Sequence, residues 1–302
     1  MELISIVVPC FNEENSITPF YNELLRILLE LNLTYEILFI DDGSSDQTLL
    51  KIQSLTKVDH QVFYYSFSRN FGKEAAMLAG LSESRGNYVV LMDVDLQHPP
   101  YLLIEMYRWI KSENIDCVGA MRLNREGENH LRSFMSHHFY SVLNKISHLE
   151  MKDGQGDYRM MSRAMVDSLL SMKEYNRYLK GMFSFVGYQT LWIPYDNVER
   201  SIGNSKWSMK QLFAYAMEGI FSFSTAPLRM AIILGSIFIL IALILLFYIL
   251  FTKVTTLKII IMILFLLSGF QVFFIGIVGE YLAKNYLESK HRPSYIIARK
   301  NR

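Results

Sequence analysis

Short apolar runs alternate with helical stretches over the first two thirds of this 302-residue chain. Runs of strand length occupy residues 4–8, 36–40, 62–66, 88–92 and 117–120. Stretches with helical spacing of their apolar residues lie between them, among them residues 17–31, 46–55 and 73–84. Strands that alternate with helices are typical of a doubly wound, mostly parallel sheet. The sequence therefore predicts an α/β domain, which we place at residues 1–205.

Polar segments follow three of the apolar runs directly, at residues 12–14, 41–46 and 93–98. In open α/β sheets, ligands bind beyond the carboxyl ends of the strands, so these segments are candidate site residues. The adjacent carboxylates Asp41 and Asp42 could accept hydrogen bonds from a base and a ribose. Ser44, Ser45 or Asp46 could instead cap the helix that follows.

A candidate metal site lies in the third of these segments. Asp93, Asp95 and Gln97 alternate along the chain, so an extended backbone would point all three side chains to the same side. Two carboxylates and an amide oxygen suit a hard cation, Mg²⁺ or Mn²⁺, which would complete its shell with substrate phosphate oxygens. The alternative is a solvated loop with ordinary carboxylates.

Two long runs near the C-terminus carry no charge. Residues 230–251 form a run of 22, about 33 Å long as a helix, and residues 259–279 form a run of 21. This pattern predicts a transmembrane hairpin over residues 230–281, preceded by an amphipathic juxtamembrane helix at 206–229. Lysines and arginines flank the hairpin, so the positive-inside rule predicts a multi-pass protein of the inner (plasma) membrane with both termini cytoplasmic.

Charge is divided unevenly along the chain. Residues 1–199 have 18 basic and 26 acidic side chains, a net charge of −8, whereas residues 200–302 have 12 and 3, a net charge of +9. The net charge of +1 argues against a polycation that binds nucleic acid. Residues 282–302 are predicted to form a basic cytoplasmic tail. Cys10 and Cys117 lie in apolar runs and indicate buried thiols in a reducing compartment.

A series of motifs follows the same order as in a known family. Residues 8–13 read VPCFNE, residues 40–46 IDDGSSD, residues 69–73 RNFGK and residues 93–100 DVDLQHPP. Further motifs are GDYRMM at 156–161, RYLKGM at 177–182, RSIGNSKW at 200–207, SFSTAPLR at 222–229 and VGEYL at 278–282. Together they resemble inverting family 2 glycosyltransferases of GT-A fold. The nearest resemblance is to the polyprenyl-phosphate branch, which includes bactoprenol glucosyltransferases and dolichol-phosphate mannose synthases.

The resemblance implies roles for individual residues. Asp93, Asp95 and Gln97 would hold the metal ion, and Asp157 and Asp95 would be catalytic. The acceptor phosphate would be bound by Arg122, Arg125 and Arg132. The nucleotide-sugar donor would contact Pro9, Asn12, Glu13, Asp41, Asp42, Arg69, Lys73, Asp93, Arg200, Ser205 and Lys206.

The activity that the resemblance implies is sugar transfer from a nucleotide diphosphate to polyprenyl (undecaprenyl) phosphate at the cytoplasmic membrane face. Glucose and N-acetylglucosamine are the favoured sugars, carried by UDP, and GDP-mannose stays open. A lipid phosphate has a second pKa near about 6 and is already an anionic nucleophile at neutral pH, so no strong general base is needed. Relatives often assemble, which predicts a homo-oligomer.

Two other functions are consistent with parts of the pattern. A processive polysaccharide synthase would need more predicted spans and a Gln-x-x-Arg-Trp motif, and the sequence has neither. A noncatalytic membrane scaffold or carrier-lipid binding protein would have no need for the combination of Asp93, Asp95, Arg122 and Arg200.

Overall fold

The computed structural model describes residues 2–112, 115–122, 155–175, 177–195 and 256–302, with isolated residues between these ranges. The chain forms two compact units. The first consists of Met1–Phe213 together with Pro293–Arg302, and the second of Ala214–Arg292. The last ten residues of the predicted basic tail thus belong to the first unit.

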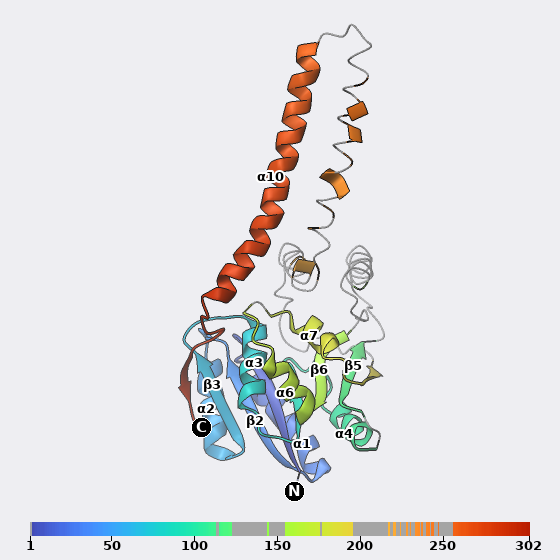
Figure 1. The fold of residues 1–302 in the computed structure, drawn as a ribbon. Helices are drawn as coiled ribbons and strands as arrows, with labels where there is room; N and C mark the ends of the chain where they lie inside the picture. Colours follow the sequence, from blue (N-terminus) through green and yellow to red (C-terminus); the bar gives the residue numbers. More distant parts are fainter. Residues whose placement is uncertain are drawn as a thin grey trace. The chain divides into compact units, whose positions relative to one another are not determined.

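The first unit is built on one mixed β-sheet (Figure 1). Its strands within the described residues are β1 (Leu3–Cys10), β2 (Thr34–Asp41), β3 (Val62–Phe67), β4 (Tyr88–Leu91), β5 (Cys117–Arg122), β6 (Gln155–Ser162), β7 (Thr190–Tyr195) and β8 (Ile297–Lys300). Their order across the sheet is β7-β5-β6-β4-β1-β2-β3-β8. All five predicted strands are present, and the α/β fold is confirmed.

Parallel and antiparallel pairs share this sheet. β1 runs parallel to β2 and β4, β2 to β3, and β5 to β7. β6 runs antiparallel to both β4 and β5, and β8 runs antiparallel to β3. The chain reverses its direction across the sheet at β1, which has β2 on one side and β4 on the other. In open α/β folds such a switch point opens a crevice at the carboxyl ends of the strands.

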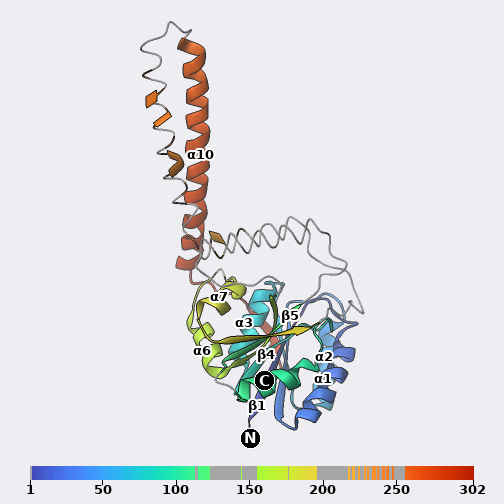
Figure 2. The same cartoon turned by 90° about the vertical axis from the view of Figure 1, so that its right-hand side faces the viewer.

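Helices cover both faces of the sheet (Figure 2). One layer contains α1 (Ile17–Leu31), α2 (Thr48–Val58) and α4 (Leu102–Ser112), and the other contains α3 (Lys73–Glu83) and α6 (Arg163–Ser171). The predicted helix at 17–31 matches α1, whose apolar residues recur every three or four positions and face the core. Asn32 ends α1 in the left-handed conformation, with a φ of 50°.

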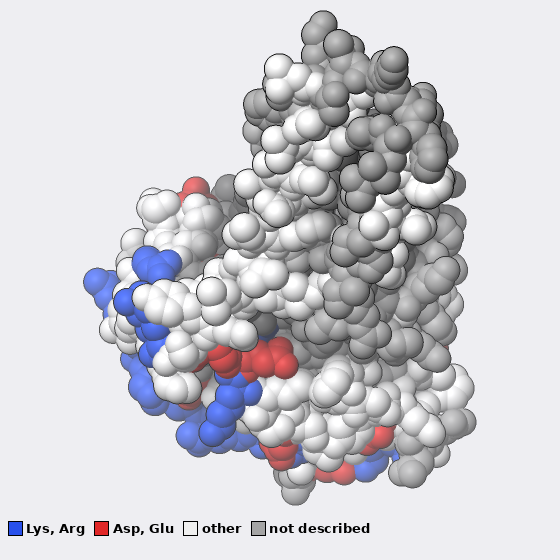
Figure 3. Space-filling model, turned by 45° about the horizontal axis from the view of Figure 1, so that its top comes forward, with Lys and Arg blue, Asp and Glu red and all other residues white. Residues whose placement is uncertain are grey.

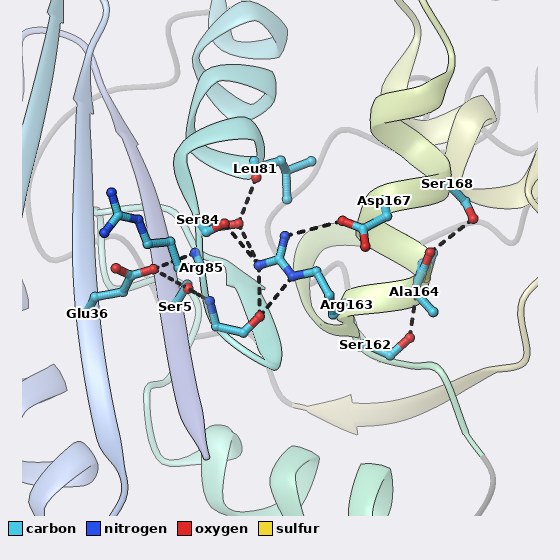
Figure 4. A network of polar contacts seen from close by, with 12 residues as sticks. Ser5, Glu36, Leu81, Ser84, Arg85, Ser162, Arg163, Ala164, Asp167 and Ser168 are labelled. Carbon is cyan, nitrogen blue, oxygen red and sulfur yellow. Dashed lines mark hydrogen bonds and ion pairs between the residues drawn. The ribbon is translucent and has the colours of Figure 1, made fainter. Parts of the chain in front are cut away.

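A buried polar network ties the sheet to the loop between α3 and β4 (Figure 4). The Glu36 carboxylate accepts hydrogen bonds from the Ser5 hydroxyl (2.6 Å) and the Arg85 amide (2.7 Å). The Arg163 guanidinium donates to the carbonyl oxygens of Ser84 and Gly86 at 2.8 to 3.1 Å. These bonds satisfy backbone groups that would otherwise be buried without partners.

Glu36→Gln is expected to lower the free energy of unfolding by about 2–3 kcal/mol. The Glu36 side chain is only 3% exposed and also pairs with Arg302 at 2.6 Å, so the neutral amide leaves a nearly buried cation without its counter-charge. Urea unfolding followed by circular dichroism measures the change. The exposed Glu30→Gln on α1 is the matched control and should leave the midpoint unchanged. Equal midpoints for both variants would contradict the prediction.

The second unit contains α10 (Thr256–Ser289). No helix in the described part of the chain is both long enough and apolar enough to cross a membrane. This finding contradicts the predicted multi-pass location in the inner membrane, and the described residues contain no hairpin of two such helices. α10 includes the second uncharged run and continues beyond it through Glu280, Lys284 and Glu288. Most of residues 206–255, including the predicted amphipathic helix and first span, lies outside the described residues.

The last ten residues of the first unit contain a strand, β8. β8 pairs with β3 at the edge of the sheet, and its Arg299 and Lys300 are exposed. Figure 3 shows lysine and arginine side chains gathered along the left of the molecule, the side on which Figure 1 draws β8. Charged residues on an edge strand discourage pairing with a further strand.

Candidate active site

The antiparallel pairing of β4 with β6 brings two distant carboxylates together. Leu91 of β4 pairs with Arg159 of β6. Because the two strands are antiparallel, Asp93, two residues after Leu91, lies across from Asp157, two residues before Arg159. Lys73, the first residue of α3, lies between them. Its Nζ is 2.7 Å from Asp93 Oδ1 and 2.7 Å from Asp157 Oδ2. Three residues from separate elements therefore form one ion-paired cluster at the carboxyl end of β4.

The ion pair of Lys73 and Asp157 shifts the pKa of both groups. Burial would by itself raise the pKa of Asp157, but the ammonium groups of Lys73 and Lys180 outweigh it and hold the pKa well below its usual range. Burial likewise opposes the charge on Lys73, and the carboxylates of Asp157 and Asp93 raise its pKa above the usual range. Asp157 is therefore an anion at neutral pH and a weak base.

The rings of His98 and Tyr158 lie beside this cluster. The His98 ring packs against Tyr158 with 5.4 Å between ring centroids, and its Nδ1 is 3.9 Å from Asp93 Oδ2. Burial lowers the pKa of His98, so the ring is neutral at neutral pH. Nδ1 of His98 and Oδ1 of Asp157 are buried and form no hydrogen bond within the described residues.

Asp41 and Asp42, predicted to face the nucleoside, are 1% and 3% exposed. Asp41 accepts hydrogen bonds from the Ser44 amide (3.1 Å) and the Ser66 hydroxyl (2.7 Å). Asp42 accepts from the amides of Phe71 (2.7 Å) and Gly72 (2.9 Å). These contacts show the two carboxylates organising the loops at the ends of β2 and β3.

The same two loops approach each other closely at Gly43. Its φ is +67°, and a Cβ there would lie 2.4 Å from the carbonyl carbon of Arg69. Glycine is therefore required by both conformation and space. Arg69 is exposed, and its guanidinium lies 3.9 Å from the centroid of the Phe71 ring.

The segment after β1 is also held by the loop after β2. The Asn12 amide donates to Ser44 Oγ (3.0 Å), and the Glu13 amide donates to Thr48 Oγ1 (2.8 Å). Asn12 has a φ of 52° and accepts a hydrogen bond from the Ser45 amide (2.9 Å). Pro9, within β1, is partly exposed.

Ser44, Ser45 and Asp46 are the three residues predicted as candidates to cap α2. Oδ1 of Asp46 accepts a hydrogen bond from the Thr48 amide at 2.9 Å, at the start of α2. Of the three capping candidates, Asp46 therefore has this bond, while Ser44 binds the Asn12 amide.

The predicted metal segment is a turn, and the expectation of an extended backbone is wrong. Leu96 has a φ of 58°, and the Gln97 amide donates to Asp95 Oδ1 at 3.1 Å. Asp93, Asp95 and Gln97 therefore do not simply alternate on one side. Among the described residues, no group of three or more histidine, cysteine, aspartate or glutamate side chains is arranged to hold a metal ion.

Of the predicted acceptor residues, Arg122 lies at the end of β5, opposite Tyr195 of β7. Burial raises the pKa of Tyr195, Arg122 opposes that rise, and Asp93 and Asp95 add to it. Arg122 is thus near the acidic segment. The other arginines predicted for the acceptor and the residues of the predicted donor loop lie outside the described residues: Arg125, Arg132, Arg200, Ser205 and Lys206.

Two basic residues near Asp157 had no predicted role. Arg159 is 3% exposed, and its guanidinium lies 3.7 Å from the centroid of the Phe183 ring. Lys180 lies in the short helix α7 (Leu179–Phe185), which the Glu74 carboxylate holds by accepting from the Leu179 amide at 3.0 Å. Both residues lie in the motifs quoted above. The sequence signal that could have identified Arg159 is a charged residue within an otherwise apolar strand.

Residues 5–170 match the family described as "Glycosyl transferase family 2". The chain belongs to this family. It is 42% identical over 306 residues to the putative glycosyltransferase CsbB of Bacillus subtilis, covering 99% of this chain and 92% of that protein. It is 40% identical over 306 residues to the bactoprenol glucosyl transferase of Shigella phage SfV, covering 97% of each. The chain is therefore a glycosyltransferase.

A solved structure shares the fold of this glycosyltransferase. The glucosyl-3-phosphoglycerate synthase of Mycobacterium tuberculosis in complex with UDP is 17% identical, with a TM-score of 0.50. The similarity covers 74% of this chain and 79% of that one. It supports the GT-A-like architecture of the first unit.

Proposed function

We propose that this glycosyltransferase transfers a sugar from a nucleotide diphosphate to a polyprenyl phosphate, with inversion at the anomeric carbon. UDP-glucose and UDP-N-acetylglucosamine are the favoured donors. The observation that carries the proposal is the ion-paired cluster of Lys73, Asp93 and Asp157 at the carboxyl end of the central strands. It occurs in a chain that is 40% identical, over nearly its whole length, to a bactoprenol glucosyl transferase.

The side chains of the segment at residues 93–97 are of the types that bind a hard divalent cation. The Lys73 ammonium lies 2.7 Å from Asp93 Oδ1, so this carboxylate already faces a positive charge. Two carboxylates and an amide suit Mg²⁺ or Mn²⁺, which take their remaining ligands from substrate phosphates. We assign Asp93, Asp95 and Gln97 to this ion. When bound, it would supply positive charge to stabilise the departing nucleotide diphosphate.

Asp157 is suited to electrostatic work and not to proton abstraction. Its lowered pKa makes it a poor general base, since an effective base has a pKa near the working pH. A phosphate monoester needs no such base, because its second pKa is near about 6. We assign Asp157 to orienting a sugar hydroxyl or stabilising positive charge at the anomeric carbon. Arg122 provides a planar guanidinium for the acceptor phosphate.

The proposal is tested with purified protein, polyprenyl phosphate and a panel of radiolabelled nucleotide sugars, each with Mg²⁺ or Mn²⁺. UDP-glucose, UDP-N-acetylglucosamine and GDP-mannose form the panel. We expect chloroform-soluble label from one UDP-sugar, with no label from the same reaction with Asp157→Asn. Failure of every donor would overturn the proposed function. The predicted homo-oligomer stays a prediction, for which the elution volume of the same preparation is the measurement.

A further inference from the structure

The last ten residues of the chain fold against the strand that leads into the site. β8 pairs antiparallel with β3, with Tyr65 opposite Lys300 and Phe67 opposite Ile297 (Figure 1). Beyond β8, the Asn301 side chain accepts a hydrogen bond from the Tyr64 amide at 2.7 Å. Before β8, the Ile296 carbonyl accepts one from the Ser68 amide at 3.0 Å. The C-terminal segment thus holds β3 along its whole length.

β3 and the loop that follows it contact residues of the candidate active site. The Ser66 hydroxyl in this strand donates to Asp41. The loop that follows places the amides of Phe71 and Gly72 on Asp42 and then starts α3 at Lys73, the residue that joins Asp93 to Asp157. A displacement of residues 68–72 would therefore move Lys73 relative to both carboxylates.

One side chain of the C-terminal segment reaches this loop through a row of rings. Tyr295 stacks on Phe67, with 5.1 Å between centroids and an interplanar angle of 12°. The rings of Phe67 and Phe71 meet edge to face, with 5.8 Å between their centroids. The Arg69 guanidinium lies 3.9 Å from the centroid of the Phe71 ring. These ring contacts connect the C-terminal segment to the loop at residues 68–72, whose Phe71 and Gly72 amides donate to Asp42.

Tyr295 also contacts α3, near the end of that helix. Burial raises the pKa of its hydroxyl, and a hydrogen bond with Ser82 of α3 opposes that rise. The residue therefore touches the strand before the loop and the helix after it. Its two contacts are thus with the last residue of β3 and with the far end of the helix that Lys73 begins.

We propose that Tyr295 is a positioning residue of the active site, acting through Phe67 and Phe71 on the loop at residues 68–72 and on Lys73. The inference rests on the proposed function only for its consequence on turnover. Its structural content, a restraint on the loop from the far end of the chain, is independent of the substrate.

The test compares hydrogen exchange at the Phe71 and Gly72 amides in Tyr295→Ala, Tyr295→Phe and the wild-type chain. Ile296→Ala is the matched control, because the neighbouring Ile296 side chain is 51% exposed and its carbonyl is retained. We expect exchange at these two amides to rise about three- to tenfold in Tyr295→Ala, the scale of one stacked aromatic pair. Tyr295→Phe keeps the ring and should restore most of the protection.

Turnover provides the second readout. The kcat/KM for the nucleotide sugar should fall by a similar factor in Tyr295→Ala, with the KM for the lipid phosphate close to that of Ile296→Ala. If Tyr295→Ala does not fold, Tyr295→Leu replaces it. Exchange at Phe71 and Gly72 equal to the control overturns the inference, and so does a rise spread evenly over β1, β2 and α1. Hydrogen exchange needs no substrate, so a wild-type chain that transfers no sugar would overturn the proposed function alone.

Discussion

Asp95→Asn is expected to abolish metal-dependent sugar transfer, lowering kcat by about a hundredfold or more. The substitution keeps the size of the side chain and removes one of the two carboxylate charges assigned to the cation. Because Oδ1 of Asp95 also accepts the Gln97 amide, the amide oxygen of asparagine can preserve the turn. Turnover at increasing Mn²⁺ and Mn²⁺ binding by calorimetry are the measurements.

Asp167→Asn is the control for this experiment. Asp167 lies on α6 with a side chain 63% exposed, and its contact with Arg163 is 3.6 Å long. It should keep wild-type turnover and wild-type Mn²⁺ binding. Wild-type turnover in Asp95→Asn would remove Asp95 from the proposed metal site.

Lys73→Met is expected to lower kcat/KM by about a hundredfold, because the cation that fixes Asp93 and Asp157 is lost. The free energy of unfolding should fall by about 1–3 kcal/mol, less than for a fully buried pair, because the Lys73 side chain is 35% exposed. Steady-state kinetics and urea unfolding give the two values. Lys111→Met is the control, since Lys111 forms an exposed ion pair with Glu2 at 2.6 Å.

The same variant should unfold at a higher pH during acid titration. In the folded chain the pKa of Asp157 is lowered below the value of about 3.9 that an unfolded aspartate has. Its ionised form therefore stabilises the fold above that pH, and the stabilisation is lost as the pH falls toward the folded pKa. Without Lys73 the pKa of Asp157 in the folded chain rises, so the ionised carboxylate stabilises the fold less and the chain unfolds at a higher pH. Circular dichroism against pH measures the midpoint; a midpoint equal to that of Lys111→Met would contradict the assigned ion pair.

Local patterns were sufficient for the central strands and for the segments that follow them. The apolar run at 36–40 ends at Asp41 and Asp42, and β2 ends there too, because a buried parallel strand is a continuous apolar run. The same reasoning located Asp93 and Asp95 beyond β4. It did not predict the turn at Leu96, because a left-handed leucine has no signature in a single sequence.

The membrane prediction is the clearest difference between pattern and structure. It rested on two uncharged runs counted along the chain, and no helix among the described residues meets the requirements of a membrane span. The count treated residue 279 as an end, whereas α10 continues to Ser289 through three charged residues. Hydropathy counting does not show where a helix ends.

The sequence by itself determined the family, through motifs in a fixed order along the chain. It also determined the α/β alternation and the acidic segments at the strand ends, because these depend on neighbours within about ten residues. Only the tertiary structure decided what those segments meet. The antiparallel insertion of β6 put Asp157 beside Asp93, and the return of the C-terminal strand put Tyr295 against Phe67. Such pairings join residues far apart in the chain, and many partners satisfy the same local pattern until the whole sheet is assembled.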